Sequence, residues 1–253
     1  MLTFNFTKYE IASEGLMLDV GCGEGRHIFG VMQHYPNMKC IGIDPHDDSL
    51  KKAEEGYEYF QSISNAGAEF MEASAYSLPF PDETFDLVVC SEVLEHLHNY
   101  MDAIDEIKRV LKKGGKFYAS VPASWPERIC WSLSKEYQNQ PGGHLRIFNQ
   151  NDLVNEIKER GFKFLSSEKF HSIHSPYWWL RCFFWNTQDQ NFLVKIYKKI
   201  LEEEKIDYKR LSGDSLKEIL RLSESDKDLW NEIFSDNKEN LDFLVEKVNK
   251  YLK

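Results

Sequence analysis

The clearest chemical pattern in the sequence is a glycine turn between a buried strand and a helix. It covers Asp19–Arg26, reads DVGCGEGR, and continues the apolar run Leu16–Val20. In open α/β sheets the ligand lies beyond the carboxyl ends of the strands, where glycines let it approach the backbone closely. Asp44 ends the next apolar run, and a carboxylate there can accept hydrogen bonds from both hydroxyls of a ribose. The pattern therefore predicts a nucleoside ligand.

The spacing of the glycines disfavours a dinucleotide. The dinucleotide-binding fingerprint has glycines at its first, third and sixth positions. Gly21 and Gly23 fit the first two, but Arg26 occupies the sixth and the third glycine is Gly25. A long side chain at the close helix–strand contact argues against NAD or FAD. Asp19, just before the turn, suits a ligand with an ammonium or sulfonium group better than a pyrophosphate.

Two aromatic segments, residues 123–149 and 171–185, hold the side chains that could contact a second substrate. A histidine could act as general base if that substrate must lose a proton, and the candidates are His144 and His174. Aromatic walls suit a flat or cationic molecule and arginine suits an acidic one. The residues expected to line this pocket are Trp125, His144, Arg146, Tyr177 and Trp178. Residues 177–181 equally fit a helix that packs two tryptophans into a core.

The elements that must position these residues alternate between strand-like and helix-like runs up to about residue 170. The expected strands are Leu16–Val20, Cys40–Asp44, Ala68–Ser74, Phe85–Cys90, Lys116–Pro122 and a sixth that begins at Phe162. Between them lie runs of helical periodicity, one from Asn99 to Leu111 that Gly114-Gly115 should end and another that Gly161 should stop. This alternation predicts an α/β fold with a doubly wound, mainly parallel sheet.

The distribution of proline and glycine divides the chain. We expect residues 1–170 to form the ligand-binding core, with a long insertion at 123–149. We expect residues 171–253 to form an aromatic lid segment and a helical C-terminal extension. In that extension Leu241, Leu244, Val245 and Val248 share one stripe, which is typical of an amphipathic packing helix and, as an alternative, of a dimerisation surface.

Composition limits the partners. The 253 residues include 42% hydrophobic residues and carry a formal charge of −10, which argues against general nucleic-acid binding and against an anionic membrane surface. No run of about 18 apolar residues is present. Five scattered cysteines without a CxxC pair favour reduced thiols and predict no metal site. We therefore expect a soluble, cytoplasmic protein, monomeric or homodimeric.

Taken in series, the motifs resemble those of the class I S-adenosylmethionine-dependent methyltransferases, of the small single-domain, type 11-like kind. LDVGCGEGRH is similar to their first motif, IGIDP to the second, and SLPFPDETFDLVVCSEVLEHL to the third and fourth together. RVLKKGGKFYASVP resembles the stretch into their fifth strand, and HLRIFNQNDLVNEIKERGF the approach to their sixth. The resemblance covers about residues 14–170. It implies a Rossmann-like fold and methyl transfer from S-adenosylmethionine to an oxygen, nitrogen or carbon atom of a small-molecule acceptor.

The resemblance also assigns roles by position. The turn at Gly21, Cys22 and Gly23 would hold the amino-acid part of the cofactor, and Asp19 would contact its ammonium group through water. The remaining positions would be Asp44 and Pro45 at the ribose, Ser74 and Ala75 at the adenine, and Cys90 and Ser91 at the methionine side. Ser74 stands where the family usually has an aspartate. Glu92 and Glu95 resemble positions near the pocket rim, although surface salt links fit them equally.

Two departures from the family pattern affect how the cofactor is covered. No convincing seventh strand follows Phe170, and only about 15 residues precede the first strand. We therefore expect the aromatic segments 123–149 and 171–185 to form the cover. Two other functions stay open: a protein that binds S-adenosylmethionine without transferring its methyl group, and a nucleotide-dependent oxidoreductase.

Overall fold

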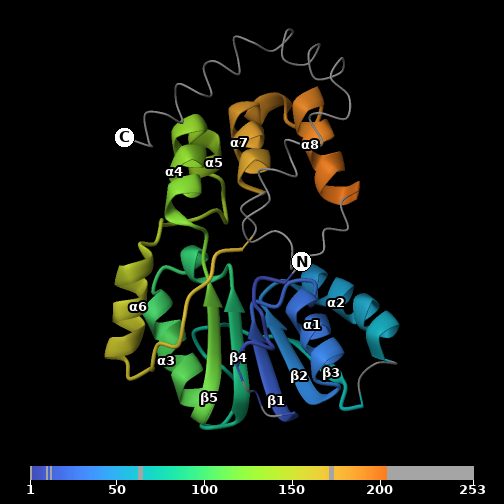
Figure 1. The fold of residues 1–253 in the computed structure, drawn as a ribbon, viewed down its shortest axis with the longest axis vertical. Helices are drawn as coiled ribbons and strands as arrows, with labels where there is room; N and C mark the ends of the chain where they lie inside the picture. Colours follow the sequence, from blue (N-terminus) through green and yellow to red (C-terminus); the bar gives the residue numbers. More distant parts are fainter. Residues whose placement is uncertain (1, 10, 12, 62–64, 171–173, 204–253) are drawn as a thin grey trace. The chain divides into compact units, whose positions relative to one another are not determined.

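The computed structural model describes residues 2–9, 11, 13–61, 65–170 and 174–203, which form two compact units (Figure 1). The first unit comprises Met1–Pro122 and His144–Ser167, and the second comprises Ala123–Gly143 and the chain from Glu168 onward. The predicted stripe at Leu241–Val248 lies outside the described residues. Within the described part of the chain, no helix is long and apolar enough to cross a membrane.

A five-stranded sheet organises the first unit. Its strands are β1 (Glu14–Val20), β2 (Asn37–Asp44), β3 (Ala68–Glu72), β4 (Phe85–Ser91) and β5 (Leu111–Ser120). They follow the order β3-β2-β1-β4-β5, and every pair is parallel. Val20 pairs with Ile43 on one side and with Cys90 on the other, so the carboxyl ends of β1, β2 and β4 align. The strand order reverses at β1, which makes this aligned edge the expected ligand site.

Alternate residues of each strand enter two separate cores, because successive side chains of a strand point to opposite faces. Met17 of β1 and Val89 of β4 join the core beneath α1 (Arg26–His34) and α2 (Asp47–Phe60). Leu18 and Val88 join the core beneath α3 (Tyr100–Val110) and α6 (Gln150–Glu159). Both faces of the sheet are therefore covered (Figure 1), which confirms the doubly wound architecture.

The helix before β5 ends earlier than its glycines suggest. We expected Gly114-Gly115 to end it, but α3 stops at Val110, and Leu111 already pairs with Phe85 of β4. The β4–β5 register then shifts, so that Leu87 pairs with Lys116. Gly114, with φ of 82°, lies in the intervening bulge rather than at a helix end. A cross-strand pairing that the local sequence does not encode has overridden the glycine signal.

The expected sixth strand is wrong. Residues 162–170 form no strand, and no further strand occurs in the described part of the chain. Phe162 packs against Phe117 of β5 with ring centroids 5.3 Å apart, but Phe164 and Leu165 are exposed. The segment therefore lies against the sheet through one side chain and makes no ladder of hydrogen bonds with it.

The described part of the second unit is helical, and the insertion that we expected at 123–149 supplies two of its helices. It contains α4 (Ser124–Leu133) and α5 (Lys135–Gln138), which join α7 (Ser175–Phe183), the 3₁₀ turn η4 (Trp185–Thr187) and α8 (Phe192–Glu203). Ile129, Cys130 and Cys182 are buried in this unit. Trp179 of α7 packs against Trp125 at 5.3 Å and donates its indole N–H to the carbonyl oxygen of Pro126.

Of the two neighbouring tryptophans of α7, only Trp179 is expected to stabilise the second unit. Trp178 is 42% exposed, whereas Trp179 makes the contacts that join α7 to α4. Trp179→Ala should lower the free energy of unfolding of this unit by about 2–3 kcal/mol, and Trp178→Ala by less than about 1 kcal/mol. Urea titrations followed by fluorescence measure this unit selectively, because none of the six tryptophans belongs to the first unit. Equal losses would contradict the assignment.

Candidate functional site

The glycine turn after β1 depends on left-handed backbone that other residues rarely adopt. Gly21, Gly23 and Gly25 have φ angles of 72°, 51° and 81°. A Cβ on Gly21 would collide with Val93, so that position is also sterically closed. At Gly23 no atom lies within 4 Å of the Cβ position. The turn therefore presents open backbone at Gly23, where a ligand can approach closely.

Hydrogen bonds inside the protein already use the amides of this turn. The N–H groups of Gly21 and Cys22 donate to the carbonyl oxygen of Ile43 at 2.8 and 2.9 Å. Gly23 donates to Oδ2 of Asp44 at 3.0 Å, and Gly25 donates to the carbonyl oxygen of Cys22. A pyrophosphate-binding turn needs its N–H groups for the ligand. This arrangement supports the interpretation that the turn does not serve a dinucleotide.

Asp19 is a fully buried carboxylate at the base of the turn. Neither of its oxygens has a hydrogen-bond partner among the described residues, and the nearest cationic candidate is Nδ1 of His27 at 4.0 Å. Burial raises its pKa from 3.8 to about 7, while Arg26 opposes the rise and Asp44 adds to it. A buried carboxylate that lacks a partner is costly unless a cation or donor binds to it. Asp19 therefore fits the ammonium group that the resemblance assigns to it.

Asp44 ends β2 and has acceptor capacity to spare. Its Oδ2 accepts from the backbone of Gly23, and its Oδ1 accepts from the backbone of His46 at 2.9 Å. The Nδ1 atom of His46 lies 3.1 Å from the same Oδ1. A carboxylate has about four lone-pair positions, so it can also accept from ribose hydroxyls. The exposed Pro45 follows directly. These residues fit the ribose end of a nucleoside.

The end of β4 lies within a hydroxyl network that the sequence did not reveal. Ser91 Oγ lies 2.9 Å from Ser120 Oγ, and Thr3 Oγ1 and Arg26 Nη2 are at 3.3 and 3.4 Å. The N-terminal segment thus reaches the ligand edge through Thr3, although it was expected to contribute no cover. No motif marks Thr3, so only the fold could identify it. Burial raises the pKa of the neighbouring Cys90 thiol well above its ordinary value, which keeps that thiol unreactive.

At the predicted adenine position, the hydroxyl of Ser74 already takes part in a hydrogen bond within the protein. Ser74 is exposed, and its hydroxyl oxygen accepts from the backbone N–H of Tyr76 at 3.2 Å. Part of its acceptor capacity is therefore used within its own turn. Ala75 packs against the core beneath α3. The contacts of Ser74 and Ala75 with adenine stay a prediction.

After β4 the structure brings together a carboxylate and two histidines that sequence reasoning treated separately. The 3₁₀ turn η2 (Leu94–His96) carries Glu95, which is fully buried rather than at a pocket rim. The ring centroids of His96 and His144 lie 4.9 Å apart. The other candidate base, His174, belongs to the second unit, where burial lowers its pKa and so favours the neutral form that a base requires.

The other residues predicted at an acceptor pocket divide between the two units. Arg146, in the first, stacks over the Tyr100 ring at 4.7 Å and donates to the carbonyl oxygen of His98. These contacts hold its guanidinium against α3. Trp125, Tyr177 and Trp178 belong to the second unit. That they line an acceptor pocket stays a prediction.

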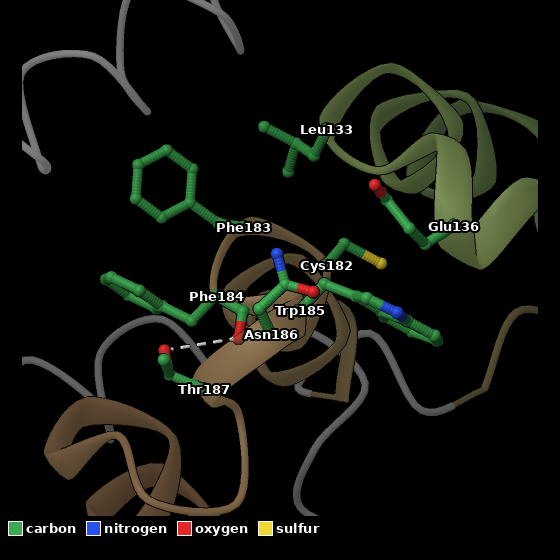
Figure 2. A pocket seen from close by; sticks show the side chains of 8 residues that line it. All are labelled: Leu133, Glu136, Cys182, Phe183, Phe184, Trp185, Asn186 and Thr187. Carbon is green, nitrogen blue, oxygen red and sulfur yellow. Dashed lines mark hydrogen bonds between the residues drawn. The ribbon is translucent and has the colours of Figure 1, made fainter.

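Figure 2 shows a pocket of about 360 Å³ within the second unit. The residues that line it are Leu133, Glu136, Cys182, Phe183, Phe184, Trp185, Asn186 and Thr187. None of them is among the residues named for the cofactor or the acceptor pocket, although six lie in the aromatic segments 123–149 and 171–185. The residues predicted for the cofactor lie in the first unit, so this pocket is not the predicted cofactor site.

Comparisons with known proteins agree with the motifs and the fold. Residues 18–119 match the family model described as a methyltransferase domain. The chain is 40% identical over 102 residues to an uncharacterized methyltransferase of Schizosaccharomyces pombe, which is 39% of this chain and 37% of that protein. It is 31% identical over 169 residues to an uncharacterized protein of Methanocaldococcus jannaschii, which is 66% of this chain and 64% of that protein. The chain thus spans less than two thirds of these relatives.

A solved structure extends the likeness of fold. A candidate methyltransferase of Bacillus halodurans C-125 superposes with a TM-score of 0.55 and 20% identity, covering 78% of this chain and 82% of that one. At this identity the likeness concerns the fold alone. It nevertheless agrees with the parallel sheet and its flanking helices.

Asp19 should make the stability of the ligand-free protein depend on pH. Its carboxyl keeps a proton in the folded state up to about pH 7 but loses it near pH 3.8 when unfolded, so its contribution to stability falls as pH rises between these values. Asp19→Asn removes this effect. The stability of the variant relative to the parent should therefore increase by about 2–3 kcal/mol from pH 5 to pH 8. Hydrogen exchange of β1 and β4 amides in urea measures it.

The matched control is Asp48→Asn, which removes an exposed carboxylate from the start of α2. Its stability relative to the parent should not change over the same interval. A relative stability of Asp19→Asn that is flat with pH would show that this carboxylate is solvated or paired in the folded protein.

Proposed function

Because residues 18–119 carry a domain of the class I S-adenosylmethionine-dependent methyltransferases, we propose that this protein transfers the methyl group of S-adenosylmethionine to a small-molecule acceptor. The observation that carries the proposal is the buried carboxylate of Asp19, which has no hydrogen-bond partner in the described part of the chain. It lies at the base of a glycine turn whose amides are already used within the protein. Such a turn favours a ligand with a positive charge over one with phosphates.

The proposed binding arrangement follows the aligned carboxyl ends of three strands. Asp19, at the end of β1, would hold the ammonium group, and the open backbone at Gly23 would contact the amino-acid part. Asp44, at the end of β2, would accept from the ribose hydroxyls. The hydroxyl network of Ser91, at the end of β4, would border the methionine side.

The task of the protein is then mainly one of alignment. S-adenosylmethionine, when bound, supplies a methyl group that is already electrophilic. The protein must place a nucleophilic atom of the acceptor about 3 Å from it, in line, and keep water out. A base is required only if that atom carries a proton to be lost, and His144 and His174 are the proposed bases. The net charge of −10 disfavours a nucleic acid as acceptor.

Removal of the Asp44 carboxylate should weaken cofactor binding. Asp44→Ala should reduce the affinity for S-adenosylhomocysteine by about 2–4 kcal/mol, or roughly 30- to 800-fold, because a hydrogen bond to a charged group contributes about 1.5–3 kcal/mol. Titration calorimetry measures the affinity. Asp44→Asn should lose less, since its amide oxygen can still accept from Gly23 and hold the turn.

Two controls make this titration specific. Asp48→Ala removes an exposed carboxylate of the same charge close by in the sequence and should leave the affinity unchanged. NADH titrated into the parent protein should produce no binding heat. Unchanged affinity in folded Asp44→Ala would refute the assignment, and tight NADH binding would favour the oxidoreductase.

Methyl transfer itself requires a separate experiment, because binding alone would also suit a protein without transfer activity. Cofactor labelled in its methyl group is incubated with the protein and a cell extract passed through a small-pore filter. Label should move to a compound of low mass with the parent protein and not with Asp44→Ala. Cofactor binding without any transferred label would favour the binding protein.

A further inference from the structure

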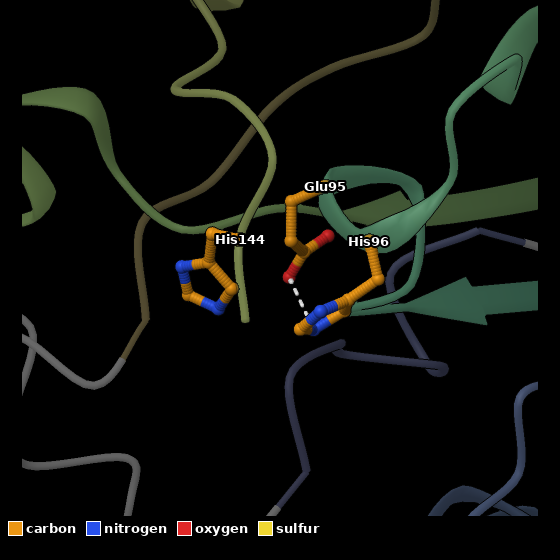
Figure 3. A group of neighbouring side chains, drawn as sticks. All are labelled: Glu95, His96 and His144. Atoms are coloured by element: carbon orange, nitrogen blue, oxygen red, sulfur yellow. Dashed lines mark ion pairs between the residues drawn. The ribbon is translucent and has the colours of Figure 1, made fainter. Parts of the chain in front are cut away.

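Glu95, His96 and His144 form a compact cluster in the first unit (Figure 3). One oxygen or nitrogen atom of each lies within 4.8 Å of the others. The Nε2 atom of His96 lies 3.9 Å from Oε1 of Glu95. Glu95 is fully buried, and the side chain of His96 is 37% exposed. The cluster is therefore anchored on the inside and accessible from one side.

We propose that these three residues bind a divalent transition-metal ion of the zinc type. Two imidazoles and one carboxylate are ligands that Zn²⁺ and its neighbours in the first transition row accept readily. At ligand distances of about 2.1 Å, the donor atoms of a tetrahedral site are about 3.4 Å apart. The shortest observed separation, 3.9 Å, exceeds this by about 0.5 Å, and none exceeds it by more than about 1.4 Å. Rotation of the exposed His96 side chain and small shifts of the other two can close these gaps.

The backbone holds the two parts of the cluster together without the metal. The N–H of Leu145 donates to the carbonyl oxygen of Glu95 at 2.9 Å. One residue further on, Nη2 of Arg146 donates to the carbonyl oxygen of His98 at 2.9 Å. His144 is therefore fixed beside η2 by contacts on its C-terminal side. Ligands positioned in advance by their backbone favour binding, because less freedom is lost when the ion enters.

The arrangement suits an ion better than a salt link alone. A single histidine would pair fully with a buried carboxylate, yet two imidazoles converge on this one. The carboxylate would offset half the charge of a dication, and both neutral rings could coordinate it. Three protein ligands leave a fourth position for water or another oxygen ligand. Cysteine spacing had predicted no metal site, but this cluster uses none of the cysteines.

The test is direct metal binding by the whole chain, freed of any affinity tag and stripped with a chelator. Co²⁺ serves as the probe, because its visible absorption reports its ligands, and Zn²⁺ is then titrated in competition. The parent protein should bind one equivalent of Co²⁺, which Zn²⁺ displaces. His96→Gln and His144→Gln should each weaken Co²⁺ binding at least about tenfold. Even substitution of a residue that only hydrogen-bonds to a metal ligand typically lowers the metal affinity about 10- to 100-fold.

His98→Gln is the matched control. His98 is exposed two residues after His96, and its backbone carbonyl oxygen accepts from Arg146. This variant should bind Co²⁺ as the parent does. Circular dichroism checks the folding of each variant, and the exposed His96→Gln still tests the site if His144→Gln does not fold.

Three results would overturn the proposal: no Co²⁺ or Zn²⁺ bound by the folded parent, parent-like affinity in folded His96→Gln, or an equal loss in His98→Gln. Metal binding is measured without cofactor or acceptor. Its outcome is therefore independent of whether the protein transfers methyl groups. A metal-bound His144 has no lone pair left for a proton, so metal binding would leave His174 as the proposed base.

Discussion

The ligand edge of the sheet depends on the hydrogen bonds that tie the glycine turn to the end of β2. One carbonyl oxygen, on Ile43, accepts from both Gly21 and Cys22, and the Asp44 carboxylate accepts from Gly23. The left-handed turn is thereby held against a neighbouring strand rather than by a ligand. Because β1 lies at the centre of the sheet, this tie also fixes where α1 begins. The backbone of the site is thus formed before any ligand binds.

The same tie explains the electrostatics of the site. The N–H groups that donate to the Ile43 carbonyl oxygen and the Asp44 carboxylate are not available as donors to Asp19, which is fully buried. Asp19 must therefore hold a proton or meet a cation, and its pKa of about 7 places the two states in balance near neutral pH. The folded protein retains an unfavourable group at the point where a positively charged ligand is expected. In binding sites of this kind, groups that favour ligand binding commonly lower the stability of the ligand-free protein.

Residues with a local physical signal could be predicted from the sequence. They are the apolar residues of the strands, the glycines of the turn, and Asp19 and Asp44. Hydrophobic periodicity marks the strands, and position in the chain marks the turn and the two aspartates. The role of Gly114-Gly115 as the end of α3 was wrong because Leu111 already pairs with Phe85, a contact between strands. The sixth strand was wrong: residues 162–170 form no strand, and Phe164 and Leu165 are exposed. Thr3 and the meeting of Glu95 with His144 depend on segments distant in sequence, which no local pattern encodes.

The second unit is discontinuous in sequence, and this has a consequence for synthesis on the ribosome. Helix α4 emerges before the whole of α6, but its partner α7 follows only after the first unit is complete. During this interval Ile129 and Cys130 have no α7 to pack against, so an apolar helix face stays uncovered on the nascent chain. Nascent chains that stall between the two helices should therefore be substrates for chaperones.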